Sequence, residues 1–351
     1  MNVGIIGAGG IARKLHLPQL ADIPDVKVTH LAGRKPHRLR LLSEQFDVPH
    51  WTTDYRDLLA DDRLDAVIVA TPHPLHVSVG LEVLAAGKHL LMQKPLCGDI
   101  DEANRFVDAV ERSDRTTMVM PHYGAEIFKC RELVEAGAIG KPSGAHCRVS
   151  HGGPEVYYAE VRDHFAETGD DLWFFQAGEA AVGALFDMGV YAVGALTAAL
   201  GSVQSVIGQV ATLDKPTTLE DTATLILHFA NGVVATAETG WCDPTRTWQF
   251  RIHGTRGKLT APGHDGAGLT LWEPGSYTRE DVPARPHAVD VSDAQRGNVH
   301  EYWLRCIHEG RPPERSHAWA ARHIVEILLA GLESSRTGQR ISIHSTSERT
   351  A

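Results

Sequence analysis

The first twelve residues contain the pattern that most restricts the fold. Val3 to Ile6 form a short apolar run, and Gly7-Ala8-Gly9-Gly10-Ile11-Ala12 follows directly, before a helical pattern that continues to Leu20. In such a strand–turn–helix unit the first glycine permits a tight turn, and the second lets the backbone approach a pyrophosphate. A small third residue allows close packing of the helix on the strand, and the helix start offers N–H groups to phosphates. The pattern predicts a dinucleotide site that includes Gly7, Gly9, Gly10, Ile11 and Ala12.

Strand and helix patterns alternate over the first 120 residues. We expect strands at 26–32, 65–70, 90–92 and 116–120, and helices at 36–46, 54–59, 74–86 and 100–112. This order predicts a doubly wound parallel sheet, so we assign residues 1–122 to a Rossmann dinucleotide-binding domain. Ligands of such sheets bind at the carboxyl ends of the strands. Two of those ends carry Thr71-Pro72 and Gln93-Lys94-Pro95.

The second strand ends in Gly33-Arg34-Lys35. An NAD-selective site usually has an acidic residue here, bonded to the adenosine ribose. Two cations suit a 2′-phosphate instead, and the guanidinium fork of Arg34 matches phosphate oxygens best. The alternative is that Arg34 and Lys35 are solvated surface charges. The sequence therefore favours NADP(H) as cofactor, with NAD(H) as the alternative.

The composition excludes several classes of partner. A net charge of −10 leaves no basic surface for nucleic acid or anionic lipid. Five cysteines without a Cys-x-x-Cys pair indicate free thiols in a reducing compartment. The chain begins with a strand-like segment rather than a signal peptide, so we expect a cytoplasmic protein. The apolar stretch 181–200 contains Asp187 and lacks flanking cationic anchors, which predicts a buried helix rather than a membrane span.

Several motifs in fixed order resemble one family. Besides the glycine fingerprint they are Thr71-Pro72-x-x-Leu75-His76, Gln93-Lys94-Pro95-Leu96, Gly183-x-Leu185-x-Asp187-Met188-Gly189-Val190-Tyr191 and Ile252-His253-Gly254-Thr255-x-Gly257. Nearly the whole chain resembles the Gfo/Idh/MocA family, the relatives of glucose–fructose oxidoreductase and inositol dehydrogenase. The resemblance implies that residues 123–351 form an α/β domain for substrate binding and oligomerisation. Its large open sheet would be mixed and mainly antiparallel, and would pair subunits into a homodimer or homotetramer. The last helix could pack back on the first domain.

The second half is compatible with such a sheet. Strand patterns occur at 144–150, 203–212, 222–229, 233–240, 248–252 and 257–260, with a final one near 340–343. Asn231-Gly232 between two of them predicts a hairpin. We expect helices at 300–309 and 318–335, and edge strands and loops at 261–298.

Asp187 and Tyr191 are four residues apart in the predicted helix, so both would project from one face. A lone buried carboxylate is costly unless it is paired, and a purely structural partner is the alternative explanation. The resemblance places this helix beside the nicotinamide and implies a catalytic set of Lys94, Asp187 and Tyr191. We expect Tyr191 to be the general acid/base, Lys94 its electrostatic partner and proton relay, and Asp187 the anchor of a substrate hydroxyl. The sequence equally allows the exchanged roles, with Lys94 as general acid/base and Tyr191 as its partner.

The remaining site candidates surround these groups. Candidate cofactor-binding residues beyond the fingerprint are Arg34, Lys35, Thr71, Pro72, His76, Gln93 and Lys94. Most relatives have glutamate where this chain has Gln93. Candidate substrate-binding residues are Lys94, His122, Tyr123, Tyr157, Trp173, Asp187 and Tyr191, with core packing as the alternative for the aromatic ones. No metal site is expected, because His73 and His76 lack an accompanying His-Glu-x-x-His pattern or carboxylate cluster.

The resemblance implies an NAD(P)-dependent oxidoreductase that transfers a hydride between the nicotinamide and a secondary alcohol or ketone. The substrate would be a sugar, cyclitol or related polyol. A dihydrodiol-type or other non-sugar carbonyl dehydrogenase is an alternative, and so is a non-catalytic regulator that senses the dinucleotide. The intact set of Lys94, Asp187 and Tyr191 favours catalysis. The only expected partners are this small molecule and further copies of the chain.

Overall fold

The computed structural model describes residues 1–168, 172–180, 182–261, 268–276, 278–292 and 298–348. The chain forms two compact units, each assembled from three separate stretches. The first unit comprises Met1–His122, Pro154–Ala181 and Gly297–Arg322. The second comprises Tyr123–Gly153, Val182–Arg296 and His323–Ala351. The chain therefore crosses between the units five times, first between His122 and Tyr123.

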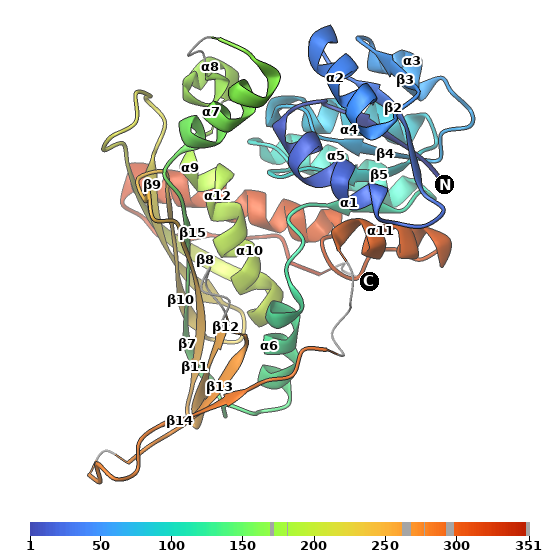
Figure 1. Ribbon diagram of the computed structural model, residues 1–351. Coiled ribbons are helices and arrows are strands. Elements are labelled where there is room, and N and C mark those ends of the chain that lie inside the picture. Colours follow the sequence, from blue (N-terminus) through green and yellow to red (C-terminus); the bar gives the residue numbers. More distant parts are fainter. Residues whose placement is uncertain (169–171, 181, 262–267, 277, 293–297, 349–351) are drawn as a thin grey trace. The chain divides into compact units, whose positions relative to one another are not determined.

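The first unit contains a six-stranded parallel sheet with the order β3-β2-β1-β4-β5-β6 (Figure 1). Its strands are β1 (Asn2–Ile6), β2 (Lys27–Ala32), β3 (His50–Thr52), β4 (Ala66–Val69), β5 (His89–Met92) and β6 (Thr117–Val119). The helices between them are η1 (Ala12–His16), α1 (Leu17–Ala21), α2 (Pro36–Phe46), α3 (Tyr55–Leu59), η2 (His73–Leu75), α4 (His76–Ala85) and α5 (Ile100–Arg112). Every residue of β4 is buried, as a strand covered on both faces requires. The predicted doubly wound sheet is confirmed.

Two later stretches complete the core of this unit. They carry α7 (Pro154–Phe165), η3 (Trp173–Phe175), α8 (Ala177–Ala180) and α11 (Val299–His308). Val161 and Phe165 of α7 and Trp303 of α11 belong to the same buried cluster as Val3 and Ile5 of β1. The sequence pattern predicts α11 but not α7. Helix α7 packs on the sheet of the first unit, and local periodicity does not reveal such a tertiary contact.

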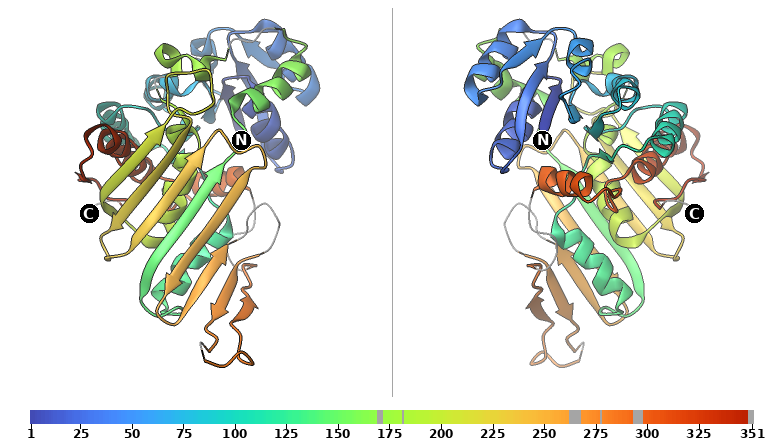
Figure 2. Two further views of the ribbon diagram at one scale, coloured as in Figure 1. Left: turned by 90° about the vertical axis from the view of Figure 1, so that its left-hand side faces the viewer. Right: turned by 90° about the vertical axis from the view of Figure 1, so that its right-hand side faces the viewer.

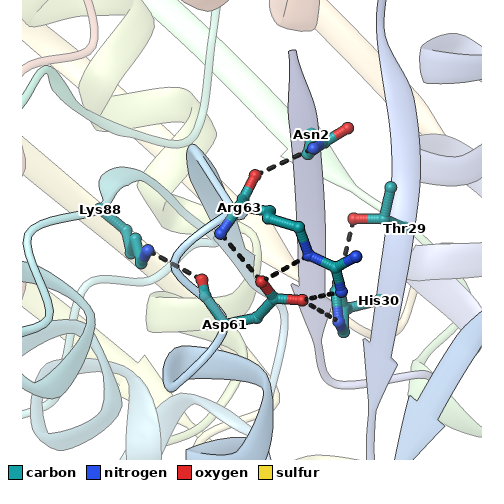
Figure 3. A network of polar contacts seen from close by, with 6 residues as sticks. All are labelled: Asn2, Thr29, His30, Asp61, Arg63 and Lys88. Carbon is teal, nitrogen blue, oxygen red and sulfur yellow. Dashed lines mark hydrogen bonds and ion pairs between the residues drawn. The ribbon is translucent and has the colours of Figure 1, made fainter.

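The amino ends of the parallel strands are tied together by a polar network (Figure 3). The Asp61 carboxylate accepts hydrogen bonds from the Arg63 backbone and guanidinium, and lies 3.3 Å from Nε2 of His30 on β2. Lys88 donates to the Asp61 carbonyl, and the Asn2 amide donates to the Arg63 carbonyl. The loop before β4 is thereby held to β1, β2 and the start of β5. The opposite, carboxyl edge carries the glycine fingerprint.

The second unit contains a nine-stranded sheet with the order β14-β13-β12-β11-β7-β10-β9-β8-β15. Its strands are β7 (Pro142–Ser150), β8 (Val203–Ala211), β9 (Thr222–Phe229), β10 (Val234–Gly240), β11 (Thr247–Gly254), β12 (Gly257–Ala261), β13 (Thr270–Glu273), β14 (Arg285–Ala288) and β15 (Ile341–Ser342). Among the described strands of this second sheet, only β7 and β10 pair in parallel. The predicted mixed, mainly antiparallel sheet is confirmed. Asn231-Gly232 forms the expected hairpin between β9 and β10, with φ of +84° at Gly232.

Among the described residues of the second unit, helices cover one face of this sheet and none covers the other (Figure 2). The covering helices are α6 (Ala125–Glu135), α10 (Gly189–Leu200) and the second-unit part of α12 (Ala318–Thr337). Buried and exposed positions alternate along β9, as in a sheet with one solvated face. Ile207, Ile226 and Val234 are exposed apolar residues of this sheet. The expected edge strands after residue 261 are β13 and β14, and the expectations for 262–267, 277 and 293–297 lie outside the described residues.

The prediction of one continuous buried helix over 181–200 is wrong. The described part consists of α9 (Ala184–Asp187) and α10, separated at Met188 with φ of −110°. Glu220 anchors the start of α9 by accepting hydrogen bonds from the backbone of Gly183 and Leu185. Gly189 opens α10, where a Cβ would lie 2.9 Å from the Leu185 side chain, so the glycine lets Leu185 of α9 pack closely on the start of α10. Asp187 and Tyr191 therefore belong to two helices rather than to one face of a single helix.

Among the described residues, none of the helices combines the length and apolar character that crossing a membrane requires.

The packing of α10 on Tyr123 gives a first testable prediction. The Tyr123 hydroxyl donates to the Val190 carbonyl, and a Cβ at Gly194 would lie 1.6 Å from that hydroxyl oxygen. We expect Gly194→Ala to lower the free energy of unfolding by about 1–3 kcal/mol, because the interior must shift to admit the methyl group. Urea unfolding measures the change. The double variant Gly194→Ala/Tyr123→Phe should recover part of the loss, and wild-type stability in Gly194→Ala would contradict the packing.

Candidate active site

The glycine fingerprint joins the carboxyl ends of β2 and β4. The backbone N–H groups of Gly7 and Ala8 both donate to the carbonyl of Ala32, the last residue of β2. Gly7 has φ of +109°, and a Cβ there would lie 2.4 Å from the backbone of Ala70. A Cβ at Gly9 would meet nothing within 4 Å. Only glycine satisfies the first position, and the second leaves open space beside the backbone, as a pyrophosphate needs.

Other groups around this loop also fit a dinucleotide. Ala12 is fully buried and Ile11 caps η1, so the helix start lies close to the strands. The Thr71 hydroxyl and Nε of Arg13 are buried, and the described part of the chain offers neither a hydrogen-bond partner. Buried donors of this kind cost free energy unless a ligand satisfies them. The side chains at the loop therefore suit the phosphates and ribose hydroxyls of a dinucleotide.

His76 connects the ends of β4 and β5. It is 1% exposed, with Nε2 2.8 Å from the Thr71 carbonyl oxygen and Nδ1 2.7 Å from the Pro95 carbonyl oxygen. Burial lowers the pKa of His76 to about 4, although both carbonyl oxygens act to raise it. Since both ring nitrogens face backbone oxygens, His76 positions the neighbouring Pro72 turn and the Lys94-Pro95 segment rather than binding a metal.

A buried chain of hydrogen bonds begins at the backbone of Lys94, which lies half-buried at the end of β5. The Lys94 N–H donates to Oε1 of Gln93, and Nε2 of Gln93 donates to Nε2 of His16. Nδ1 of His16 then lies 2.7 Å from Nε2 of His300, whose Nδ1 lies 3.0 Å from Oε1 of Gln19. The backbone donor orients the amide, and the amide fixes the tautomers. Each imidazole accepts one hydrogen bond and donates one, so both rings are neutral.

Acid should break this chain. Burial is the main cause that lowers the pKa of His16 well below its usual value, and burial lowers the pKa of His300 to about 4. Both residues have a pKa of about 6.5 in an unfolded chain. The unfolded chain therefore binds more protons between about pH 6.5 and pH 4, so the free energy of unfolding falls as the pH decreases through this window.

His300→Gln tests this origin of the acid sensitivity. Glutamine can keep one donor and one acceptor in the chain but cannot take up a proton. At pH 5 the wild-type cost from His300 alone is roughly 2 kcal/mol. We expect the variant to lose less stability than wild type between about pH 7.5 and pH 5, measured by urea unfolding at each pH. Parallel losses in the two proteins would contradict neutral imidazoles in the folded chain.

In the second unit, two N–H donors converge on the Asp187 carboxylate. Nε1 of the fully buried Trp241 donates to Oδ2 at 2.9 Å, and Nε2 of His151 lies 3.5 Å from the same oxygen. Nδ1 of His151 accepts the Gly153 N–H, so the ring proton is on Nε2 and faces Asp187. The Asp187 side chain is 12% exposed, and these two donors offset the cost of burying its charge. Both of these contacts are made to Oδ2 of Asp187.

Spacing within the helix does not reveal either partner of Asp187. A usable signal is present, however, because His151 and Trp241 each follow directly after a predicted strand, 144–150 and 233–240. Tyr191 lies half-buried on α10, with its ring 6.2 Å from that of Trp248. Tyr123 is buried beneath α10, and burial raises the pKa of its hydroxyl well above the usual value. Its contacts are those of a residue that supports the helix.

The other candidate substrate residues lie in the first unit. His122 stacks on Tyr302 at 5.1 Å, and burial lowers its pKa to about 4. Tyr157 of α7 lies over the fingerprint, since a Cβ at Gly10 would be 2.6 Å from its hydroxyl oxygen. Trp173 packs against His73, which follows the end of β4. The structure thus brings Tyr157 and Trp173 near the cofactor residues of this unit.

The cations after β2 have an unexpected neighbour. Arg34 is exposed, but Nζ of Lys35 lies 2.6 Å from the Glu167 carboxylate. His37 and Arg38 contact the same carboxylate. Hydrogen bonds from Arg38 are the largest cause that lowers the pKa of Glu167, to about 2. Neither His37, Arg38 nor Glu167 is a site candidate from the sequence.

Comparison with known proteins agrees with this architecture. Residues 1–120 match a family model described as an oxidoreductase family with NAD-binding Rossmann fold, and residues 127–260 match the GFO/IDH/MocA C-terminal domain. The chain is 29% identical over 238 residues to an uncharacterized oxidoreductase, YrbE, of Bacillus subtilis, covering 66% of this chain and 64% of that protein. It is 25% identical over 347 residues to a D-xylose 1-dehydrogenase (NADP(+)) of Haloferax volcanii, covering 98% and 100% of the two chains.

A solved structure extends the likeness to the fold of the whole chain. Levoglucosan dehydrogenase in complex with NADH and L-sorbose superposes with a TM-score of 0.82 at 20% identity, covering 98% of this chain and 99% of that one. The fingerprint, the strand-end motifs and both domain matches lead to one conclusion. The chain belongs to the Gfo/Idh/MocA family of oxidoreductases, with an NAD-binding Rossmann fold in its first part.

Proposed function

We propose that this protein transfers a hydride between a nicotinamide dinucleotide and a secondary alcohol or ketone of a sugar, cyclitol or related polyol. The observation that carries the proposal is the Asp187 carboxylate, which is mostly buried and is positioned by Trp241 and His151 beside its Oδ2. A carboxylate has room for about four acceptor contacts, so it can also receive a substrate hydroxyl. The levoglucosan and D-xylose dehydrogenases among the relatives act on substrates of this class by their names.

The residues take the following roles. Tyr191 exchanges the proton of the reacting hydroxyl as general acid/base, and Lys94 stabilises the charge that develops and relays the proton. Asp187 anchors a neighbouring hydroxyl and so orients the reacting carbon. Gln93 and His76 act through Lys94, because they hold its backbone at the end of β5. When bound, the nicotinamide supplies or accepts the hydride.

For the cofactor we propose a preference for NADP(H), with Arg34 and Lys35 binding the 2′-phosphate. The β2 end supplies cations where an NAD-selective site has an acidic residue. Names among the relatives point both ways, with NADP(+) for the D-xylose dehydrogenase and NADH in the levoglucosan dehydrogenase complex.

Purified protein assayed at the NADPH absorbance band against sugars, inositols and keto-sugars tests the function. We expect turnover with at least one of them, and a higher kcat/KM with NADPH than with NADH. Lys94→Ala and Tyr191→Phe should each lower kcat by about 10²-fold or more, since each removes a group that acts on the transferred proton. Tyr123→Phe is the matched control and should retain kcat, because Tyr123 contacts the same helix, α10, only as a support through the Val190 carbonyl.

Two outcomes would contradict this proposal. Near-normal turnover in both Lys94→Ala and Tyr191→Phe would remove the assigned roles. Tight NADPH binding with no turnover on the whole panel would favour a regulator that senses the dinucleotide.

We also propose that the open sheet face pairs subunits into a cytoplasmic homodimer or homotetramer. The sheet presents exposed apolar side chains at Ile207, Ile226 and Val234. Strands β13 and β14 extend the sheet at one edge. We expect sedimentation to give a dimer or tetramer, and Ile226→Lys to shift it toward monomer, because a buried unpaired ammonium opposes association. The control is Leu213→Lys, because Leu213 is exposed and lies in a loop outside the sheet. A wild-type monomer at micromolar concentration would contradict the pairing.

A further inference from the structure

Glu167 forms a dense set of contacts with the cations that follow β2. Its carboxylate receives Nζ of Lys35 at 2.6 Å, Nε2 of His37 at 2.7 Å, and two guanidinium nitrogens of Arg38 at 2.5 Å each. The Glu167 side chain is 13% exposed and that of Arg38 15%. The two parallel Arg38 contacts form a bidentate pair, which is stronger and more directional than an ordinary surface ion pair.

The backbone holds Glu167 in this position. Helix α7 ends at Phe165, whose ring packs under the Arg38 guanidinium at 4.7 Å. Ala166 then adopts φ of +50°, a left-handed conformation that costs an alanine about 1 kcal/mol. The turn directs the next side chain, Glu167, back onto α2. Phe165 and Glu167, the two neighbours of the strained Ala166, thus both contact the Arg38 guanidinium.

The carboxylate lies beside the cations that follow the end of β2, where folds of this type bind the adenosine ribose. Lys35 caps α2 directly after the end of β2, and Gly7 and Ala8 bond to Ala32 at that same end. Helix α7 also lies against Gly10 through Val161 and Tyr157. One segment of the first unit, 154–168, therefore contacts the fingerprint with its helix and the adjacent cations with Glu167.

We propose that Glu167 is a specificity-determining residue that competes with the 2′-phosphate of NADP(H) for Lys35 and Arg38. This inference rests on the proposed function only in assigning these cations to a dinucleotide. A 2′-phosphate carries close to two negative charges and three acceptor oxygens, so it can replace the carboxylate on the same donors. NADP(H) binding then includes the cost of releasing Glu167. NAD(H) has only a hydroxyl at this position and leaves the ion cluster in place.

Glu167 thereby reduces the advantage that the cations alone would give NADP(H). The carboxylate is tethered, so it competes at an effective concentration set by the fold rather than by the solution. A chain with these cations and no Glu167 would select NADP(H) strongly. With Glu167 the two cofactors come closer in affinity.

Glu167→Gln tests the competition by direct binding, without any substrate. We expect the dissociation constant of NADPH to fall by about tenfold or more, and that of NADH to change by less than about twofold. Adenosine 2′,5′-bisphosphate should gain as NADPH does, and adenosine 5′-monophosphate should not. Glu160→Gln is the matched control. Glu160 lies on α7, the helix that precedes Glu167, and its carboxylate pairs with Lys14 at 3.3 Å rather than with Lys35 or Arg38. It should leave both dissociation constants unchanged.

Hydrogen exchange of the wild-type protein provides the second readout. Saturating NADPH should speed exchange in residues 154–168 relative to saturating NADH, because only the phosphate releases Glu167. Equal changes in both dissociation constants for Glu167→Gln, or a loss of NADH binding alone, would overturn the proposal. So would protection of this segment by NADPH. A folded variant with the expected binding shift but no turnover on any polyol would contradict the proposed function alone.

Discussion

The first unit depends on one buried chain of hydrogen bonds, from the Lys94 N–H through Gln93, His16 and His300 to Gln19. It joins the end of β5, the helix after the fingerprint and α11, which lie far apart in the sequence. Each step needs one donor and one acceptor, and Gln93 supplies both, because its Oε1 accepts from the Lys94 N–H and its Nε2 donates to His16. The orientation of this amide therefore sets the direction of the whole chain through two neutral histidines.

Much of the fold follows from local patterns. The parallel sheet was predictable because each strand is an apolar run followed by glycine or proline and a helix, and the hairpin at Asn231-Gly232 needs only two residues. The helix break at Met188 could not be predicted from the local pattern, because it depends on Glu220 and on close packing around Gly189. The local pattern does not indicate helix α7, for a related reason. Its apolar face packs on the first unit although the neighbouring residues in sequence belong to the second.

The candidate site divides in the same way. Backbone-determined parts, such as Gly7 and the strand ends at Thr71 and Lys94, could be named from spacing, because the fold makes one geometry available to them. The partners of charged side chains could not. Glu167 lies 132 residues from Lys35, and Trp241 lies 54 residues from Asp187. Electrostatic pairing of this kind is decided by tertiary packing, which local periodicity does not encode.

The placement of His151 and Trp241 nevertheless follows a rule used for the first unit. Strands β7 and β10 run parallel with Ser150 opposite Gly240, so the residues that follow them emerge at the same edge. An antiparallel pair would send its two successors to opposite edges. The parallel pair β7 and β10 therefore brings its following residues to one edge of the sheet. Strands β4 and β5 do the same in the first unit, where Thr71 and Gln93 follow them at one edge. The pairing of β7 with β10 lets two side chains from distant segments reach one carboxylate, Asp187, to which Trp241 donates a hydrogen bond and beside which His151 lies.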